Sequence, residues 1–516
     1  MSGSSETPVP AGPPPLTLRS SSALLGIFVS AMMAGLNSRS GALGLADVRG
    51  ALGFGTDDAS WLNTFYSAGE LMAMPFTTWF AITFTVRRFH LTMLTASALI
   101  AAVVPLTVNL NLLLTLRLVQ GITAGALIPI LMMMALSMLP PPIRLHGLAL
   151  YAMTATFAPN VAIWIVGQWT DIVIDWRWLY WQFIPVALIS GGLVAWALPK
   201  VPVQWKRFSS INWTSLAVGL PGLFLMVVAL DQANRLDWFN SPLVSSALTA
   251  GAICLVAFAI SEWSHPAPFI KFQLLARRNL AVGFTIFIFL LTTFLSGTVL
   301  PTSFMTSNWG YRALQNAPIG LIIGLPQLIA GSLVALLLYR KWVDARYVMA
   351  AGLTLVGLAC LRAAQLDALW TWEQLIPVQI LHAIGQPMAV VSMLFLATSV
   401  VQPMEGQYIS GFVNVSRSLA TVMGGAFVNH LLEIREHFHS WLLTDRFGMI
   451  AQILPQAANA ADVSSIFDTQ ALTLATADVY RVLGLLAFLL VPLTLAMQYI
   501  PAPNLPSKAL GSKNNG

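Results

Sequence analysis

Residues 112–137 read LLLTLRLVQGITAGALIPILMMMALS and contain a single charged side chain, that of Arg117. A helix of about 20 consecutive apolar residues crosses the core of a bilayer, so this stretch is long enough to span a membrane. The same composition extends along the chain, because 57% of the 516 residues are apolar and only 9% are charged. Soluble proteins carry about 25% charged residues. The composition therefore excludes a soluble enzyme, a nucleic-acid-binding protein and a disordered scaffold.

Apolar runs recur along the whole sequence and predict fourteen transmembrane helices. They fall approximately at 22–45, 60–82, 91–109, 112–137, 147–168, 178–198, 212–231, 243–261, 280–300, 316–339, 347–364, 375–399, 408–431 and 479–500. A lipid-facing β-barrel is excluded, since its strands would alternate apolar and polar residues. We therefore predict an all-α polytopic membrane protein.

The basic residues predict the orientation of these spans. Most lysines and arginines fall on one side when both termini are placed in the cytoplasm, as the positive-inside rule requires. Residues 1–21 are rich in Pro, Ser and Gly and predict a disordered cytoplasmic tail, and residues 501–516 form a second tail. Residues 432–478 form a long predicted outer loop with some helical spacing, which could pack over the outer face.

Three local motifs resemble those of the major facilitator superfamily, and within it the fourteen-span drug:proton antiporter branch. Residues 117–125, RLVQGITAG, resemble the R-x-x-Q-G-x-x-x-G motif of span 4, whose arginine is implicated in proton coupling. The segment holding Ala158, Pro159, Gly167 and Asp171 resembles the antiporter motif at the end of span 5. Residues 176–185, WRWLYWQFIP, are similar to the W-R-W-x-F-x-x-N-x-P run of the branch.

The sequence also departs from the branch. Asn37 stands where the branch usually has an aspartate in span 1, and Gly167 is the one glycine left of the antiporter motif's G-P-x-x-G-G. The loop at 78–88 keeps its basic residues but lacks the usual glycine and aspartate.

The resemblance implies a domain organisation and a mechanism. Residues 22–200 and 280–500 would form two six-helix bundles, and residues 201–279 a linker with two inserted central helices. Such proteins bind substrate near the midplane and rock between two orientations. The implied activity is proton-coupled efflux of amphipathic drugs or toxic small molecules.

Four charged residues fall well inside predicted spans: Arg39, Glu70, Arg117 and Arg417. A charge at that depth is costly and by default suggests a function. The resemblance implies that spans 1, 2 and 4 belong to one bundle, so Glu70 could lie between Arg39 and Arg117, where its carboxylate could load a proton outside and release it inside. A static ion pair between spans 1 and 2 is the alternative. The partner of Arg417 is predicted to be an acid of an outer loop or a lipid head group.

Polar side chains within the spans are candidate substrate contacts, and each could instead be a hydrogen bond between helices: Asn37, Gln120, His382, Gln386, Asn414 and Arg417. Small or rigid residues of the motifs are candidates for close packing or gating: Gly121, Gly125, Pro159 and Gly167. Asp171 is interpreted as a cap or interface charge at the outer end of span 5. The scattered histidines and two apolar cysteines predict no metal site, and no cofactor is expected.

The predicted function is secondary transport, not enzymatic catalysis. A dedicated exporter or importer of one metabolite within the same superfamily is the first alternative, and a non-transporting membrane receptor or scaffold is the second. The expected partners are a small-molecule substrate, protons and the lipid bilayer, without nucleic acid. By analogy with some relatives, a periplasmic adaptor could dock on the outer loop. The expected location is the plasma membrane, which is the inner membrane in a double-membraned bacterium.

Overall fold

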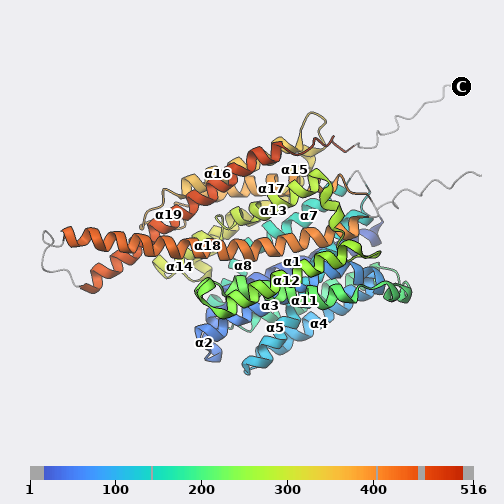
Figure 1. The fold of residues 1–516 in the computed structure, drawn as a ribbon, viewed down its shortest axis with the longest axis horizontal. Coiled ribbons are helices and arrows are strands. Elements are labelled where there is room, and N and C mark those ends of the chain that lie inside the picture. Colours follow the sequence, from blue (N-terminus) through green and yellow to red (C-terminus); the bar gives the residue numbers. More distant parts are fainter. Residues whose placement is uncertain (1–16, 141–142, 403–404, 451–459, 504–516) are drawn as a thin grey trace, which may run out of the picture.

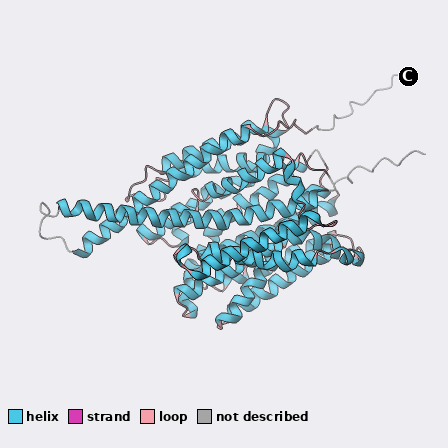
Figure 2. Cartoon of the chain, in the orientation of Figure 1, coloured by secondary structure: helices cyan, strands magenta, loops and turns pink. Residues whose placement is uncertain are grey.

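Every regular element in the computed structural model of this chain is a helix (Figure 2). The structure describes residues 17–140, 143–402, 405–450 and 460–503, and no strand occurs among them. The prediction of an all-α fold is confirmed. Most of both predicted tails (1–16 and 504–516) and residues 451–459 of the predicted outer loop lie outside the described residues.

Within the described chain, eleven helical segments are long and apolar enough to cross a membrane. They are α1 (Leu18–Leu43), α4 (Val86–Val103) with η1 (Val104–Leu106), α5 (Leu110–Gly125) with α6 (Leu127–Met138), α9 (Trp178–Trp181) with α10 (Phe183–Ala197), α11 (Trp213–Gln232), α12 (Pro242–Ser264), α13 (Arg278–Phe294) with α14 (Val299–Trp309), α15 (Ala313–Leu338), α16 (Ala345–Ala363), α17 (Ile376–Thr398) and most of α19 (Ala460–Leu495). The chain is therefore a polytopic helical membrane protein.

A bent pair of helices makes a twelfth such segment when it is counted as one span. α7 (Arg144–Thr156) and α8 (Ala158–Gly167) meet at 45°. Pro159 lies in the first turn of α8, where its missing N–H removes a hydrogen bond to the preceding turn. The bend follows from this break, and it places Pro159 and Asn160 at the wall of a central cavity.

Two further long helices complete the bundle. α3 (Thr56–Phe84) has 29 residues and α18 (Gly406–Ile450) has 45. α3 packs along α5, and α18 packs along α13 and α19. The shorter elements are α2 (Leu45–Leu52), a π-helical turn η2 (Gln168–Ile172), and the 3-10 turns η3 (Trp205–Ser210), η4 (Trp238–Asn240) and η5 (Phe272–Ala276).

The helices before residue 200 and those after residue 277 meet along two lines of contact. In the first, α7 and α8 pack against α15, and in the second, α3 and α6 pack against α18. α11 and α12 pair with each other, and α11 also lies against α3 and α18. The central cavity lies between these two lines.

The predicted outer loop at 432–478 is largely helical in its described part. α18 continues to Ile450, α19 begins at Ala460, and together they project beyond the other helices (Figure 1). At the base of this projection Asp478 accepts hydrogen bonds from Arg435 and Arg481 and lies 2.8 Å from Nε2 of His439. The described part of this segment therefore extends away from the bundle and does not pack over its face (Figure 1), and the charged cluster joins its two helices to each other.

A second charged cluster joins the start of α13 to the start of α18. Arg277 donates from Nη1 to Oε2 of Glu405 at 2.6 Å and from Nη2 to Oε1 at 2.9 Å. Burial on its own would raise the pKa of Glu405, but the Arg277 fork and the backbone N–H of Gln402 hold that pKa below its ordinary value. The ionised carboxylate is therefore the favoured form here.

Candidate functional site

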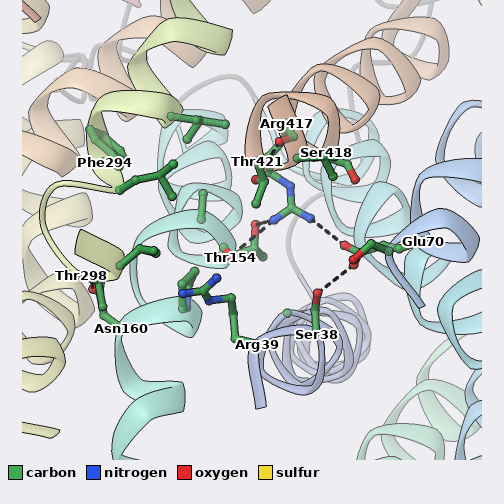
Figure 3. Close-up of a pocket in the computed structure, with 18 of the residues that line it drawn as sticks. Ser38, Arg39, Glu70, Thr154, Asn160, Phe294, Thr298, Arg417, Ser418 and Thr421 are labelled. Atoms are coloured by element: carbon green, nitrogen blue, oxygen red, sulfur yellow. Dashed lines mark hydrogen bonds and ion pairs between the residues drawn. The ribbon is translucent and has the colours of Figure 1, made fainter. Parts of the chain in front are cut away.

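A cavity of about 140 Å³ lies at the centre of the molecule, between helices from the early and the late parts of the chain (Figure 3). Its polar lining comes from α1, α3, α7, α8, α17 and α18. Its apolar lining comes mainly from α13, α14 and α18, and includes Leu291, Phe294, Leu295, Val299 and Val422. The cavity is smaller than the roughly 300–1,000 Å³ of most ligand pockets. A drug-sized molecule would therefore require the helices to separate.

Glu70 carries the acidic group of this cavity. Oγ of Ser38, on α1, donates to Oε2 of Glu70 at 2.9 Å, and Nη2 of Arg417, on α18, lies 3.9 Å from Oε1. Nη1 of Arg417 also donates to Oγ1 of Thr154 at 3.2 Å. About a tenth of each charged side chain is exposed. The pair thus connects α3 to α18, which are adjacent in space and far apart in sequence (Figure 3).

The partner of Glu70 therefore differs from the prediction. Arg117 is buried, donates from Nε to the carbonyl of Leu62 and from Nη1 to Oε1 of Gln120 at 2.8 Å, and lies 4.3 Å from the ring centroid of Tyr66. Leu62 precedes Glu70 by two helical turns, which is about 12 Å along α3. Arg117 thus binds α3 at a different level from the carboxylate. The expected partners of Arg417, an outer-loop acid or a lipid head group, are replaced by Glu70.

Arg39 lines the cavity on α1, with its side chain directed into it (Figure 3). Its Nε is buried without a hydrogen-bond partner, and the described residues offer its guanidinium no ion pair within 4 Å. Arg39 and Glu70 were predicted to lie side by side; both line this cavity, but the carboxylate is bound by Ser38 and Arg417.

Two glycines of the span-4 motif bring α5 against α3 at the level of Glu70. A Cβ atom on Gly121 would lie 2.1 Å from the carbonyl oxygen of Tyr66, and one on Gly125 would lie 2.7 Å from Cα of Glu70. Neither position tolerates a side chain without movement of the backbone. This geometry matches the interpretation of both residues as close-packing glycines.

The residues at the end of span 5 form a junction with α15. Asp171 accepts from Nε of Arg312 at 2.7 Å and from the backbone N–H of Leu314 at 2.8 Å, and Arg312 also donates to Asp47 at 2.9 Å. The hydrogen bond and charge of Asp171 raise the pKa of Arg312. Gly167 lies against the backbone of Leu314 in the same junction. Asp171 thus acts as a cap and interface charge. No sequence motif contains Asp47 or Arg312, so their part in this junction could not be predicted from the sequence.

The other predicted substrate residues divide between the cavity and the packed interior. Gln386 lines the cavity, whereas His382 is buried 3.3 Å from Oγ of Ser296 and 3.5 Å from Nε2 of Gln386. Oδ1 of Asn414 accepts from the hydroxyl of Tyr151 at 3.0 Å. Asn414 therefore lies in a contact between α7 and α18.

The remaining two candidates, Asn37 and Gln120, are also buried outside the cavity lining. Sequence reasoning missed Ser38, Thr154, Asn160 and Thr298, which line the cavity. Of these four residues, Asn160 could most easily have been predicted from the sequence, since it is an amide inside an apolar span. It accepts from Thr298 and thereby joins α8 to the turn before α14.

A second cavity, of about 370 Å³, lies between the start of α7, the end of α17 and the segment after α19. Among the described residues that line this cavity, Arg144 is the one with a charged side chain. No three His, Cys, Asp or Glu side chains in the described chain come together in a way that could hold a metal ion.

Comparison with known proteins supplies a family and several relatives. The model of the Major Facilitator Superfamily matches residues 23–424. The chain is 26% identical to the fatty acid resistance protein FarB of Neisseria gonorrhoeae, over 82% of this chain and 83% of that one. It is 23% identical to the multidrug export protein EmrB of Escherichia coli K12, over 82% of each chain. It is also 23% identical to the colistin resistance protein EmrB of Acinetobacter baumannii, over 88% of this chain and 91% of that one.

Solved structures share the fold at low identity. The human organic anion transporter MFSD10 superimposes with a TM-score of 0.53 at 15% identity, covering 92% of this chain and all of the other. A bacterial homologue of the human drug peptide transporters PepT1 and PepT2 gives 0.56 at 13% identity, covering 92% and 98%. At this identity the likeness concerns the fold alone.

Proposed function

Because the chain belongs to the major facilitator superfamily, we propose that it is a secondary transporter that expels amphipathic small molecules in exchange for protons. The family predicted from the span-4 motif is confirmed, and with it a multi-pass membrane protein of a transporter family, not an enzyme. The efflux activity is supported by the names of the relatives, which concern export of drugs and resistance to fatty acids or colistin.

The observation that carries the proton coupling is the pair of Glu70 and Arg417 across the central cavity. Arginine stays protonated, so within this pair Glu70 is the group that can gain and lose a proton. The ionised carboxylate attracts Arg417 and holds α3 to α18. Protonation removes that attraction and leaves Ser38 as the hydrogen-bonding partner of Glu70. A proton on Glu70 would thus weaken the contact of α3 with α18, which is one of the two lines along which the early and late helices meet.

We assign Arg117 a supporting role in this coupling. Its contacts fix α5 against the outer half of α3, and the glycines of the same motif fix the level of Glu70. The junction of Arg312 with Asp47 and Asp171 would close the outer side while Glu70 is exposed to the inside. Alternating access would then require both contacts to open and close in turn.

The proposal includes fourteen spans with both termini in the cytoplasm. The bent pair α7–α8 and the long helices α3 and α18 would add to the eleven apolar segments. Residues 22–200 and 280–500 would be the two moving bundles, with α11 and α12 inserted between them. A six-span first bundle requires the start of α1 and the end of α10 to lie on the same side of the membrane. In support, the guanidinium of Arg19 at the start of α1 lies 6.0 Å from the ring of Trp196 at the end of α10.

An adaptor protein in the periplasm is part of the proposal, with its contact on the projection of α18 and α19. Phe438 and Trp441 are 43% and 67% exposed there, and Ile466 lies exposed on the returning helix. Trp441→Glu should then reduce drug resistance of cells while leaving transport by the purified protein in liposomes unchanged. Unchanged resistance in cells would exclude this surface as the contact.

The central test is transport in proteoliposomes with an imposed pH gradient and a panel of dyes and organic acids. Glu70→Gln should abolish accumulation that depends on the gradient, whereas Glu433→Gln, which changes an exposed carboxylate of α18, should not. Full retention of coupled transport by Glu70→Gln would refute the proposal that Glu70 carries the coupled proton. Transport of one organic acid and none of the dyes would favour the dedicated metabolite transporter instead.

A further inference from the structure

The charges that line the central cavity do not balance. Within the described lining there are two cations, Arg39 and Arg417, and a single anion, Glu70. Glu70 is already bound by Arg417 and by Ser38. Arg39 is therefore a cation without a counter-ion in the described structure, inside a membrane-embedded bundle.

An unpaired cation in such a place is costly, because burial removes the water that would otherwise stabilise it. The cost persists in a folded protein only where something else requires the charge. Nε of Arg39 is buried without a partner, and among the described residues none accepts a hydrogen bond from the guanidinium, so its N–H groups lack a protein acceptor. A guanidinium presents its N–H groups as a planar fork that matches carboxylate, sulfonate and phosphate oxygens.

The wall of the same cavity supplies the second half of a binding site. Phe294 lies across the cavity from Arg39 (Figure 3), and Leu291, Leu295, Val299 and Val422 extend this apolar lining. A molecule that fits both features has an anionic head for the guanidinium and an apolar body for the aliphatic and aromatic side chains. Cationic amphiphiles would meet Arg39 with the wrong charge.

We propose that Arg39 is the head-group anchor of the substrate site, and that the site selects anionic amphiphiles over neutral or cationic ones of the same shape. This inference rests on the proposed transport function and names its substrate class. Glu70 then serves the proton, while Arg39 serves the substrate. The two roles lie on neighbouring positions of one cavity.

A matched pair of fluorescent compounds tests the inference. Anilinonaphthalene sulfonate and N-phenylnaphthylamine share their aromatic body, and the first adds a sulfonate. Binding of each to the purified full-length chain in maltoside micelles is measured after subtraction of protein-free micelles. Arg39→Gln should weaken binding of the sulfonate about 10- to 100-fold, the loss expected for charge-assisted hydrogen bonds, and leave the neutral amine unchanged.

Two further variants keep the result interpretable. Arg39→Lys retains the charge without the planar fork and should give intermediate sulfonate binding, which a misfolded protein would not do. Arg144→Gln removes the cation of the second cavity and should leave sulfonate binding intact. Loss of binding in Arg144→Gln alone would place the anion in that second cavity and overturn the proposal.

A lipid head group offers the same chemistry, so phosphatidylglycerol is titrated in the same assay. Retention of this lipid by the wild type but not by Arg39→Gln, without sulfonate binding, would show that the anion is a lipid and overturn the proposal. Equal loss of sulfonate and amine in Arg39→Gln would overturn it as well.

This binding experiment, combined with the proteoliposome transport assay, separates the inference from the proposed function. Arg39-dependent sulfonate binding without any pH-driven transport would remove the proposed function and leave the anion site. Coupled transport of the neutral amine with no effect of Arg39→Gln on the sulfonate would leave the proposed function and remove the anion site.

Discussion

The closest approach between α3 and α5 gives a prediction whose size follows from the structure. A Cβ atom on Gly121 would lie 2.1 Å from the carbonyl oxygen of Tyr66, whereas ordinary contacts of this kind begin at 3.4 Å. Gly121→Ala therefore requires α5 and α3 to separate by about 1.3 Å at this point. The same Cβ would lie 3.0 Å from the backbone nitrogen of Glu70, so the shift reaches the carboxylate's own turn.

The energetic cost follows from the general behaviour of overpacked interiors, which lose about 1–3 kcal/mol per inserted group. Alanine favours a helix over glycine by up to about 1 kcal/mol, and this gain must be removed from the comparison. Gly192→Ala provides the control, since Gly192 also lies in a span helix, α10, and its added Cβ would meet nothing within 4 Å. Relative to this control, Gly121→Ala should melt roughly 1–3 °C lower, because a chain of 516 residues has a large entropy of unfolding.

The assay is thermal unfolding of both variants and the wild type, purified in the same detergent. Transport driven by a pH gradient should also fall in Gly121→Ala, because the shift of α3 changes the position of Glu70 relative to Arg417, which lies 3.9 Å away in the wild type. Identical melting of the two alanine variants would refute the reasoning. It would mean that α3 and α5 are not held together through this glycine.

Three further changes probe other contacts. Arg312→Gln removes the cation that joins α15 to Asp171, and should speed the labelling, by an impermeant thiol reagent added outside, of a cysteine introduced into the cavity. Glu405→Gln should lower the melting temperature at neutral pH, because Arg277 holds the pKa of Glu405 below its ordinary value in the folded protein. The stabilisation by the ionised carboxylate is complete above the ordinary glutamate pKa of about 4.3. It is lost as the pH falls through the lowered pKa of the folded state. Arg117→Lys should reduce transport without moving its pH profile, because the guanidinium contacts Leu62 and not the acid of the cavity.

Each of these predictions has an outcome that contradicts it. Unchanged labelling in the Arg312 variant, made in a chain without Cys254 and Cys360, would show that the outer junction does not limit access. If Glu405→Gln still melts lower than the wild type in strong acid, the contribution of Glu405 to stability does not depend on its negative charge, and the prediction is wrong. A pH profile of Arg117→Lys shifted like that of a Glu70 variant would place Arg117 in direct contact with the titrating group.

The sequence alone determined the membrane-spanning helical class, because hydropathy is a local property and a bilayer admits few alternatives to helices. It also identified the positions where mechanism is expected, since charges inside apolar runs are rare. The motif that contains Gly121 and Gly125 suggests close packing of the helix that carries them, and in the structure a Cβ atom at either position would meet the backbone of α3. All of this follows from a single segment considered at a time.

Tertiary structure alone decided which charges meet. Nothing in the spacing of Glu70 relates it to Arg417, which lies in the other half of the chain, and the contact exists because α3 and α18 are adjacent and turned towards each other. Hydropathy does not predict that rotation in a helix surrounded by other helices, since apolar residues cover every face. The prediction of Arg117 as a partner was wrong for the same reason, and the unpaired state of Arg39 emerges only when all the helices around it are in place.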